Sequence, residues 1–237
     1  MKNRNTLVVF VVAMLLHLEC PQTFAYLKDQ KKGAQQTSNL GEKLYSAVRK
    51  GDIYASKRLL AKGIDVNSRY MDGETLLMRA AVDGHTDIVK LLIQKGANVN
   101  QNDSFGFTAL GLAVLNNRLI IVQYLLKHKA NVNGMLHGEL PLVLAADKSN
   151  LQMTRLLLAN GANVDDQDRW GNTALIAATA RDTEALVSLL LDKKANPSIR
   201  NKRGENALSI AEKGGKSSLI LLLSGKSPLI LLLRGTQ

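Results

Sequence analysis

Short apolar runs alternate with polar breaks along most of the chain. In the segment "TLLMRAA", Leu76 and Leu77 are followed by Ala80 and Ala81, which is the spacing of one face of a helix. The segment "DIVKLLIQ" from Asp87 has the same spacing. The pattern predicts two short helices joined by a polar turn.

This pair of helices recurs with a nearly constant period. The glycines that open successive units are spaced by 33, 32, 33 and 33 residues, at Gly73, Gly106, Gly138, Gly171 and Gly204. Each unit closes on "GANVN" or a variant of it. Because such a unit buries only one face by itself, the repetition predicts hairpins that stack on one another.

The predicted helix ends carry the residues that helix ends require. Threonines that can cap the first helix of a unit precede it at three places: Thr75, Thr108 and Thr173. Glycines that can adopt a left-handed conformation follow the second helix at Gly63, Gly96 and Gly161. Lys129 and Lys194 stand in the place of this glycine, and Leu140 stands in the place of the cap. We therefore expect Leu140→Thr to raise stability by about 0.5 to 2 kcal/mol.

These units resemble ankyrin repeats, whose period is 33 residues and whose first helix carries the signature T-P-L-H-x-A. The resemblance covers residues 40–224 and includes "TLLMRAA", "TALGLAV", "LPLVLAA" and "TALIAAT" as first helices, "GHTDIVKLL" as a second helix and "GANVN" as the loop. No unit keeps the threonine and the proline together. The resemblance implies an all-α solenoid of stacked helix-turn-helix units with β-turn or hairpin loops.

The pattern divides the chain into six parts. We expect a signal peptide at residues 1–25, a flexible leader at 26–39, and an N-terminal capping repeat at 40–72. Four repeats follow at 73–203, then a C-terminal capping repeat at 204–224. Residues 225–237 form an apolar tail in which "GKSPLILLLR" nearly duplicates "GKSSLILLLS" of residues 215–224. The tail has no place in the period, so we expect it to fold back, to pair with another chain or to contact a membrane.

The N-terminal pattern predicts export. Lys2 and Arg4 precede an apolar run from Leu7 to Leu18, and small residues lead up to Ala25. An uncleaved membrane anchor is the alternative, although the run is shorter than the ~20 residues that span a bilayer. Cys20 is the only cysteine, so cleavage would leave no thiol for a disulfide or a zinc site.

The net charge is strongly basic. There are 31 basic and 20 acidic residues, which gives +11, and removal of residues 1–25 leaves 29 and 19, or +10. Such a charge favours acidic partners, and for an exported chain these are acidic proteins, anionic lipid headgroups or cell-envelope polymers rather than nucleic acid.

The residues with catalytic or ligand-binding chemistry form no known constellation. The segments "GGKSS" and "SGKSP" lack the earlier glycine of a phosphate loop, since Ile210 and Ile220 stand at that position. His85 is expected to make a local hydrogen bond at the start of a second helix, and Asp165, Asp166 and Asp168 to lie in a solvated turn rather than a calcium loop. The sequence predicts no enzyme, no cofactor and no metal.

The resemblance places partner recognition on loop tips and on the exposed ends of the first helices. Carried over to this chain, these positions are Tyr70, Met71, Asp72, Asp83, Ser104, Phe105, Phe107, Asn116, Leu136, His137, Lys148, Arg169, Trp170, Arg181, Lys202 and Arg203. Aromatic residues and arginine are typical interface anchors. Phe105 or Trp170 packing on a neighbouring hairpin is the structural alternative.

The functional expectation is a non-catalytic protein-binding module, an adaptor or scaffold, in the periplasm or outside the cell. The alternative is a basic protein that binds a membrane surface or a polyanion, through Arg200, Lys202, Arg203, Lys213 and Lys216 near the apolar tail. We expect a monomer, with self-association through the tail as the alternative.

Overall fold

Helices dominate the part of the chain that the structure describes. The computed structural model describes residues 37–225, and these contain twelve α-helices in six hairpins and no extended strand. The helices are α3 (Thr37–Arg49), α4 (Ile53–Leu60), α5 (Leu76–Asp83), α6 (Thr86–Gln94), α7 (Ala109–Leu115), α8 (Leu119–Lys127), α9 (Pro141–Asp147), α10 (Leu151–Ala159), α11 (Ala174–Ala180), α12 (Glu184–Asp192), α13 (Ala207–Lys213) and α14 (Ser217–Leu223). The all-α repeat architecture predicted from the sequence is confirmed.

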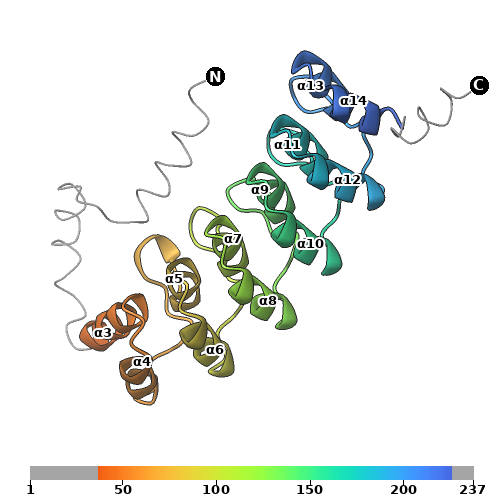
Figure 1. Ribbon diagram of the computed structural model, residues 1–237. Helices are drawn as coiled ribbons and strands as arrows, with labels where there is room; N and C mark the ends of the chain where they lie inside the picture. Colours follow the sequence, from red (N-terminus) through yellow and green to blue (C-terminus); the bar gives the residue numbers. More distant parts are fainter. Residues whose placement is uncertain (1–36, 226–237) are drawn as a thin grey trace, which may run out of the picture. The chain divides into compact units, whose positions relative to one another are not determined.

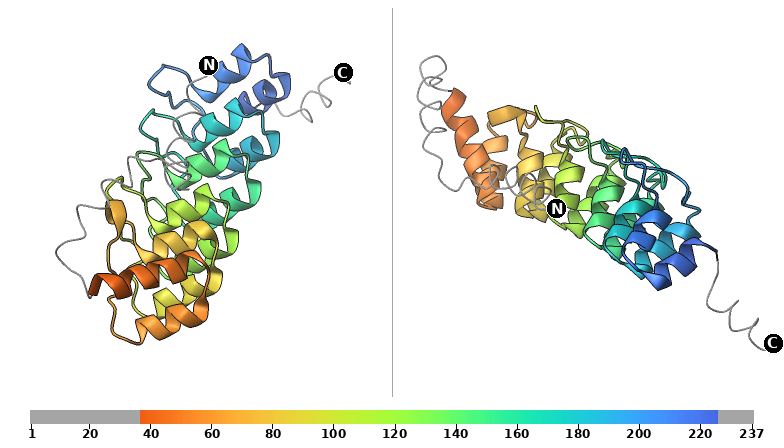
Figure 2. Two further views of the ribbon diagram at one scale, coloured as in Figure 1. Left: turned by 90° about the vertical axis from the view of Figure 1, so that its left-hand side faces the viewer. Right: turned by 90° about the horizontal axis from the view of Figure 1, so that it is seen from above.

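The hairpins stack in two layers within the compact unit that begins at Leu44. The first helices α5, α7, α9, α11 and α13 contact one another in order and form an inner row. The second helices form an outer row, and the loops between hairpins extend beyond the inner row (Figure 1). Figure 2 shows these loops gathered along one edge of the array. None of the helices described here is both long enough and apolar enough to cross a bilayer.

The core follows from the apolar spacing. Leu76, Leu77, Ala80 and Ala81 of α5 are all at most 1% exposed, and the corresponding residues of the next three inner helices are also buried. On the outer row, Ile88 and Val89 of α6 are equally buried. Each hairpin therefore presents one apolar side to the hairpin before it and one to the hairpin after it.

The predicted threonine caps are confirmed. The hydroxyls of Thr75, Thr108 and Thr173 accept from the amides of Met78, Gly111 and Ile176 at 3.2, 3.2 and 3.3 Å. Leu140 precedes α9 without a side-chain cap, as expected, and Pro141 follows at the first helical position.

The expected gain in stability from Leu140→Thr is wrong, because it does not take the burial of Leu140 into account. Leu140 is 4% exposed, so its side chain is part of the core. A threonine there would gain a capping bond of about 1 kcal/mol and lose apolar burial of about 1.5 to 3 kcal/mol.

The left-handed positions after the outer helices are also confirmed. Gly63, Gly96 and Gly161 have φ values of 83°, 87° and 86°. Lys129 and Lys194 adopt the same region with φ of 65° and 62°. Both lysines therefore carry a backbone cost of about 1 to 2 kcal/mol that glycine avoids.

An asparagine ladder joins successive "GANVN" turns. The amide oxygen of Asn67 accepts from the backbone nitrogen of Asn98 at 2.7 Å, while its amide nitrogen donates to the carbonyl of Gly96 at 3.2 Å. Asn100 makes the same pair of bonds to the next turn. The "GANVN" motif recurs because its last asparagine forms hydrogen bonds that join each turn to the following one.

A second row of contacts links the starts of outer helices to the inner helix of the hairpin before. Arg118, just before α8, donates to the carbonyls of Val82 and Asp83, both at 3.2 Å, and Lys216, just before α14, donates to the carbonyl of Thr179 at 2.8 Å. His85 lies 3.1 Å from the carbonyl of Arg49, so its bond runs to the previous hairpin and the expectation of a local bond is wrong. Cations suit this place because the carboxyl end of a helix carries partial negative charge.

The expected ends of the array need one correction. α3 begins at Thr37, so residues 37–39 belong to a helix and not to a flexible leader. The first copy of the duplicated segment forms α14, with Leu219 and Leu223 buried, as its place in the period predicted. The expected signal peptide, most of the leader and the tail beyond Gly225 lie outside the described residues.

Candidate protein-binding surface

The loop tips are built as short β-hairpins. Isolated antiparallel bridges join Arg69 to Thr75, Asn102 to Thr108 and Leu136 to Glu139. A carboxylate or amide oxygen closes three of the tips by accepting two backbone amides each. Asp103 Oδ1 accepts from Phe105 and Phe107, Asp168 Oδ1 from Trp170 and Asn172, and Asn201 Oδ1 from Arg203 and Glu205, all at 2.8 to 3.0 Å.

These bonds change the interpretation of the acidic loop residues. Asp168 is 7% exposed, so it is a buried acceptor and not a solvated turn residue. Asp103 is buried to the same degree, and burial raises its pKa against the lowering effect of the backbone amides. Among the described residues, no group of three histidine, cysteine or acidic side chains is placed to hold a metal ion.

Backbone hydrogen bonds connect the tips to one another. The amide of Ser104 donates to the carbonyl of Asp72 at 2.8 Å, that of Arg169 to Gly138 at 2.7 Å, and that of Lys202 to Trp170 at 2.9 Å. Phe107 and His137 add a ring contact at 6.1 Å between the third and fourth hairpins. The tips therefore form a connected rim, so a partner would meet an ordered surface.

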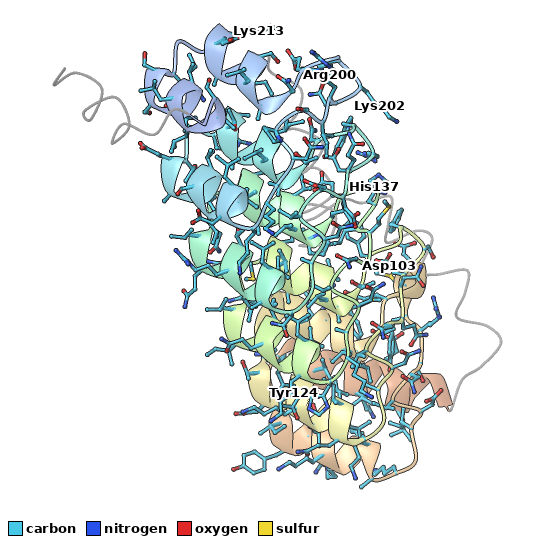
Figure 3. The ribbon with its side chains drawn as sticks, turned by 90° about the vertical axis from the view of Figure 1, so that its right-hand side faces the viewer. Asp103, Tyr124, His137, Arg200, Lys202 and Lys213 are labelled. Atoms are coloured by element: carbon cyan, nitrogen blue, oxygen red, sulfur yellow. The ribbon has the colours of Figure 1, made fainter. Side chains whose placement is uncertain are left out.

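Most of the predicted recognition residues lie on this rim or beside it. Nine are exposed: Met71, Asp72, Ser104, Phe105, His137, Lys148, Arg181, Lys202 and Arg203. Five are half-buried: Tyr70, Asp83, Asn116, Arg169 and Trp170. In Figure 3, His137 and Lys202 lie along the loop side of the array, away from Tyr124 on the outer helix α8.

Two of the predicted residues are not displayed, and their assignment to the exposed tip is wrong. Phe107 is 6% exposed and Leu136 is 2% exposed. A Cβ atom built on Gly111 would lie 2.1 Å from Leu136, so Leu136 occupies the space beside α7 that this glycine leaves open. The fourth loop is one residue shorter than the others and forms a two-residue turn at His137 and Gly138, both with positive φ. This turn directs Leu136 inward.

The residue that the sequence pattern missed at this loop is Met135. It is 54% exposed and stands beside the inward Leu136. The 32-residue spacing and Gly111 were the available signals of a shifted loop. With Met71 at 45% and Phe105 at 46%, Met135 completes a set of exposed apolar side chains on three consecutive tips.

The chemistry of the rim changes toward its C-terminal end. The guanidinium of Arg169 lies over the ring of Trp170, 4.1 Å from its centroid, so this half-buried tryptophan contacts the preceding residue of its own tip. Lys202 and Arg203 are exposed on the next tip, and neither forms an ion pair within residues 37–225. Repeats two to four thus present apolar tips, and repeats five and six present basic ones.

Several candidates on the inner helices already have partners within the chain. Arg181 donates to both carboxylate oxygens of Asp147 at 3.0 and 2.9 Å, and this hydrogen bonding raises the pKa of the guanidinium. Both side chains are nearly half exposed, so the pair adds little stability. Asn116 donates to the carbonyl of Leu112 at 2.8 Å and caps its own helix.

A buried polar cluster supports the second tip. Arg79 contacts Glu74 at 2.9 Å and Asp83 at 3.7 Å, and its Nε donates to the hydroxyl of Tyr45 at 3.0 Å. Tyr45 also donates to Glu74 and lies against the ring of Tyr70. Burial and then the Glu74 carboxylate raise the pKa of Tyr45, so this phenol remains protonated. The cluster fixes Tyr70 and Asp83 in place.

Comparisons with known proteins identify the repeats. A family model described as ankyrin repeats (3 copies) matches residues 44–135 and 142–230. The chain belongs to the ankyrin repeat family. Proteins built from ankyrin repeats are interaction modules that bind other proteins, and the rim described above is the ankyrin surface formed by the hairpin tips.

Curated relatives match parts of this ankyrin array. The mouse B-cell lymphoma 3 protein homolog is 35% identical over 74 residues, and the mouse ankyrin repeat and SAM domain-containing protein 6 is 36% identical over 74 residues. Each match covers 31% of this chain, and the chain spans only 16% and 8% of those proteins.

Solved structures match most of the array. A chain from the structure of the Bdellovibrio bacteriovorus predatory endopeptidase Bd0816 in complex with immunity protein Bd3460 is 32% identical, with a TM-score of 0.71, and the match covers 78% of this chain and 98% of that one. An ankyrin repeat domain from Acinetobacter baumannii AYE is 28% identical, with a TM-score of 0.73 and coverage of 77% and 96%.

Proposed function

We propose that this ankyrin protein is exported and holds another protein of the same compartment against the rim of its hairpin tips. The observation that carries the proposal is the contrast between a uniform framework and varied tips. The ladder residues and caps recur in successive repeats, whereas Met71, Phe105 and Lys202 occupy corresponding tips with different chemistry. Such tips are free to fit one partner.

The charge of the rim favours a partner with an acidic region beside an apolar one. Met71, Phe105 and Met135 are large exposed apolar side chains, and side chains of this kind supply the anchors of interfaces. Lys202 and Arg203 lie two repeats further along, where an acidic group would speed association and set the orientation.

The Bdellovibrio structure supports an enzyme as the partner class. It is a complex of an endopeptidase with an immunity protein, and the chain of it that resembles this array does so over 98% of its own length. We propose that the array acts without catalysis of its own, as an accessory or protective protein for an exported enzyme.

The test uses exposed apolar residues on two different faces. The triple variant Met71→Ala, Phe105→Ala and Met135→Ala removes the apolar tips, while Tyr54→Ala with Ile120→Ala removes side chains that are 82% and 64% exposed on the outer helices. In affinity capture from the native extract, the tip variant should lose the captured protein at least tenfold and the outer-helix variant should retain it. Equal retention by both variants would exclude the rim as the binding surface.

Export is tested separately. The mature protein should begin at Tyr26, which mass spectrometry of the chain purified from its native source will show. A mass that includes residues 1–25 in full would favour the membrane-anchored alternative.

A second candidate is binding to a polyanion, favoured by the position of unpaired cations. Lys213 pairs with Glu205 at 2.8 Å, and Arg200 and Lys216 donate to backbone carbonyls, so three of the five cations expected for this role are engaged. Six lysines without an ion pair in residues 37–225 lie together at or just after the C-terminal ends of outer helices: Lys62, Lys95, Lys127, Lys129, Lys193 and Lys194. Their ordinary role is to face the negative ends of those helices.

Salt dependence distinguishes this candidate. Binding to heparin or to anionic vesicles should weaken steeply as salt rises. Replacement of Lys95 and Lys193 by glutamate should weaken that binding further, whereas Lys202→Glu should not. No retention at physiological salt would remove the polyanion candidate.

A further inference from the structure

The last hairpin has an apolar side that no described residue covers. Leu77, Leu110, Leu142 and Leu175 occupy corresponding positions in the earlier inner helices and are 1 to 3% exposed, whereas Leu208 of α13 is half-buried. In the outer row, Val89, Val122 and Val187 are fully buried, whereas Ile220 of α14 is half-buried. We call the surface formed by Leu208, Ile220 and Leu222 the end face.

The backbone leaves α14 toward this end face. Gly225 follows α14 where Gly96 follows α6, and it has a φ of 66° against 87° for Gly96. At Gly96 this left-handed turn carries the chain to the next hairpin of the stack. The same turn at Gly225 therefore carries it in the direction in which a seventh hairpin would lie.

The sequence after Gly225 has the composition of a covering helix. Ser227 and Pro228 form a typical helix start, with a capping hydroxyl before a proline at the first helical position. Five apolar residues follow, from Leu229 to Leu233. Six helical residues, from Pro228 to Leu233, would measure about 9 Å, which is close to the length of α13 and α14, each of seven residues.

We propose that residues 227–233 of the same chain pack on the end face and close the array. The linker from Gly225 to Ser227 is short, which gives the tail a high effective concentration at its own end face compared with that of a second copy. The near-duplication then has a physical reason. The first copy fills the outer position of repeat six, and the second copy supplies apolar side chains of the same kind to cover it.

The experiment compares the full chain with a chain that stops after Gly225. Removal of the tail should lower the urea concentration at the unfolding midpoint and speed amide exchange in α13 and α14. Leu208→Ala should lower the midpoint in the full chain and have a much smaller effect in the truncated one. Ser218→Ala is the matched control, because Ser218 lies on the exposed side of α14 and should have the same effect in both.

A full-length variant covers the case in which the truncated chain does not fold. Leu229→Asn with Leu233→Asn should reproduce the faster exchange in α13 and α14 while the exchange of α5 to α9 stays unchanged. Light scattering should give a monomer for every form.

Three results would overturn the proposal. These are equal effects of Leu208→Ala with and without the tail, a full chain that is dimeric while the polar-tail variant is monomeric, and tail-dependent binding to anionic vesicles with no change in exchange at α13 and α14. The second would assign the tail to another copy, and the third to a membrane.

Discussion

Single residues decide where the repeat departs from its regular form. Leu136 points inward because the turn at His137 and Gly138 is one residue shorter, and α7 accepts it because position 111 is glycine. The two changes compensate each other across a hairpin boundary. Their pairing is a packing constraint, which explains why Met135 is displayed instead.

Gly111→Ala should destabilise the array. Alanine is normally the better helix former by about 1 kcal/mol, but its Cβ would lie 2.1 Å from Leu136, and such overpacking costs about 1 to 3 kcal/mol. Urea unfolding measures the change. Adding Leu136→Ala to Gly111→Ala should recover part of the loss. A single variant more stable than the parent would contradict the packing of Leu136 on this glycine.

Lys129→Gly should stabilise the protein by about 1 kcal/mol, because Lys129 has a φ of 65° and glycine adopts that region without the steric cost. Lys95→Gly is the control. Lys95 is the C-cap of α6 and has a φ of −87°, which lysine adopts without strain. Glycine at this position would only increase the conformational entropy of the unfolded chain, so it should destabilise the protein. Thermal unfolding of both variants decides whether backbone conformation sets the difference.

At the scale of helices and turns, the ladder of asparagines formed by Asn67, Asn100 and Asn133 is interrupted at the fourth turn. Asp165 replaces asparagine at the fourth turn and still accepts from the backbone nitrogen of Asn196 at 2.8 Å. A carboxylate has no N–H to donate, so Asp165 lacks the second bond of the ladder. At earlier turns this bond ends on the carbonyl of Gly96 or Lys129, and the corresponding carbonyl at this turn is that of Lys194.

Asp165→Asn should raise stability by about 0.5 to 1.5 kcal/mol by supplying that missing donor. Asp166→Asn is the matched control, since Asp166 already accepts from the amide of Asn163 at 2.6 Å and the change weakens a charged acceptor. If Asp165→Asn leaves the urea midpoint unchanged, the donor half of the ladder contributes nothing measurable.

The first two hairpins are joined by the buried cluster around Arg79. Replacing Arg79 by methionine should cost about 3 to 5 kcal/mol, because Glu74, which is 7% exposed, would remain as a buried charge without its partner. Combining it with Glu74→Gln should restore much of the loss. Equal instability of the single and double variants would show that the packing of Arg79, and not its charge, holds the hairpins together.

Helix positions and their ends were predictable because they depend on local spacing and local caps. The threonine caps and the left-handed lysines followed directly from the period, as the confirmed geometry of Thr75 and Lys129 shows. The contacts between hairpins were not predictable in the same way. Arg118 bonds to carbonyls 35 and 36 residues earlier, and nothing in its neighbourhood along the chain indicates them.

At the scale of the whole molecule, the stack separates stability from recognition. Caps, ladder asparagines and buried leucines recur in successive repeats, while the tips vary between apolar and basic side chains. The period predicted which loops form the rim. It did not predict which tip side chains face outward, because Phe107 and Leu136 turn inward through contacts with neighbouring hairpins.

Hydrogen exchange on the array with and without its captured partner tests the central claim most directly. The account predicts slower exchange in the partner-bound state at the tips of residues 101–107, 134–139 and 167–172, with no change in the outer helices α6, α8 and α10. Protection confined to those outer helices, with the tips unchanged, would contradict it.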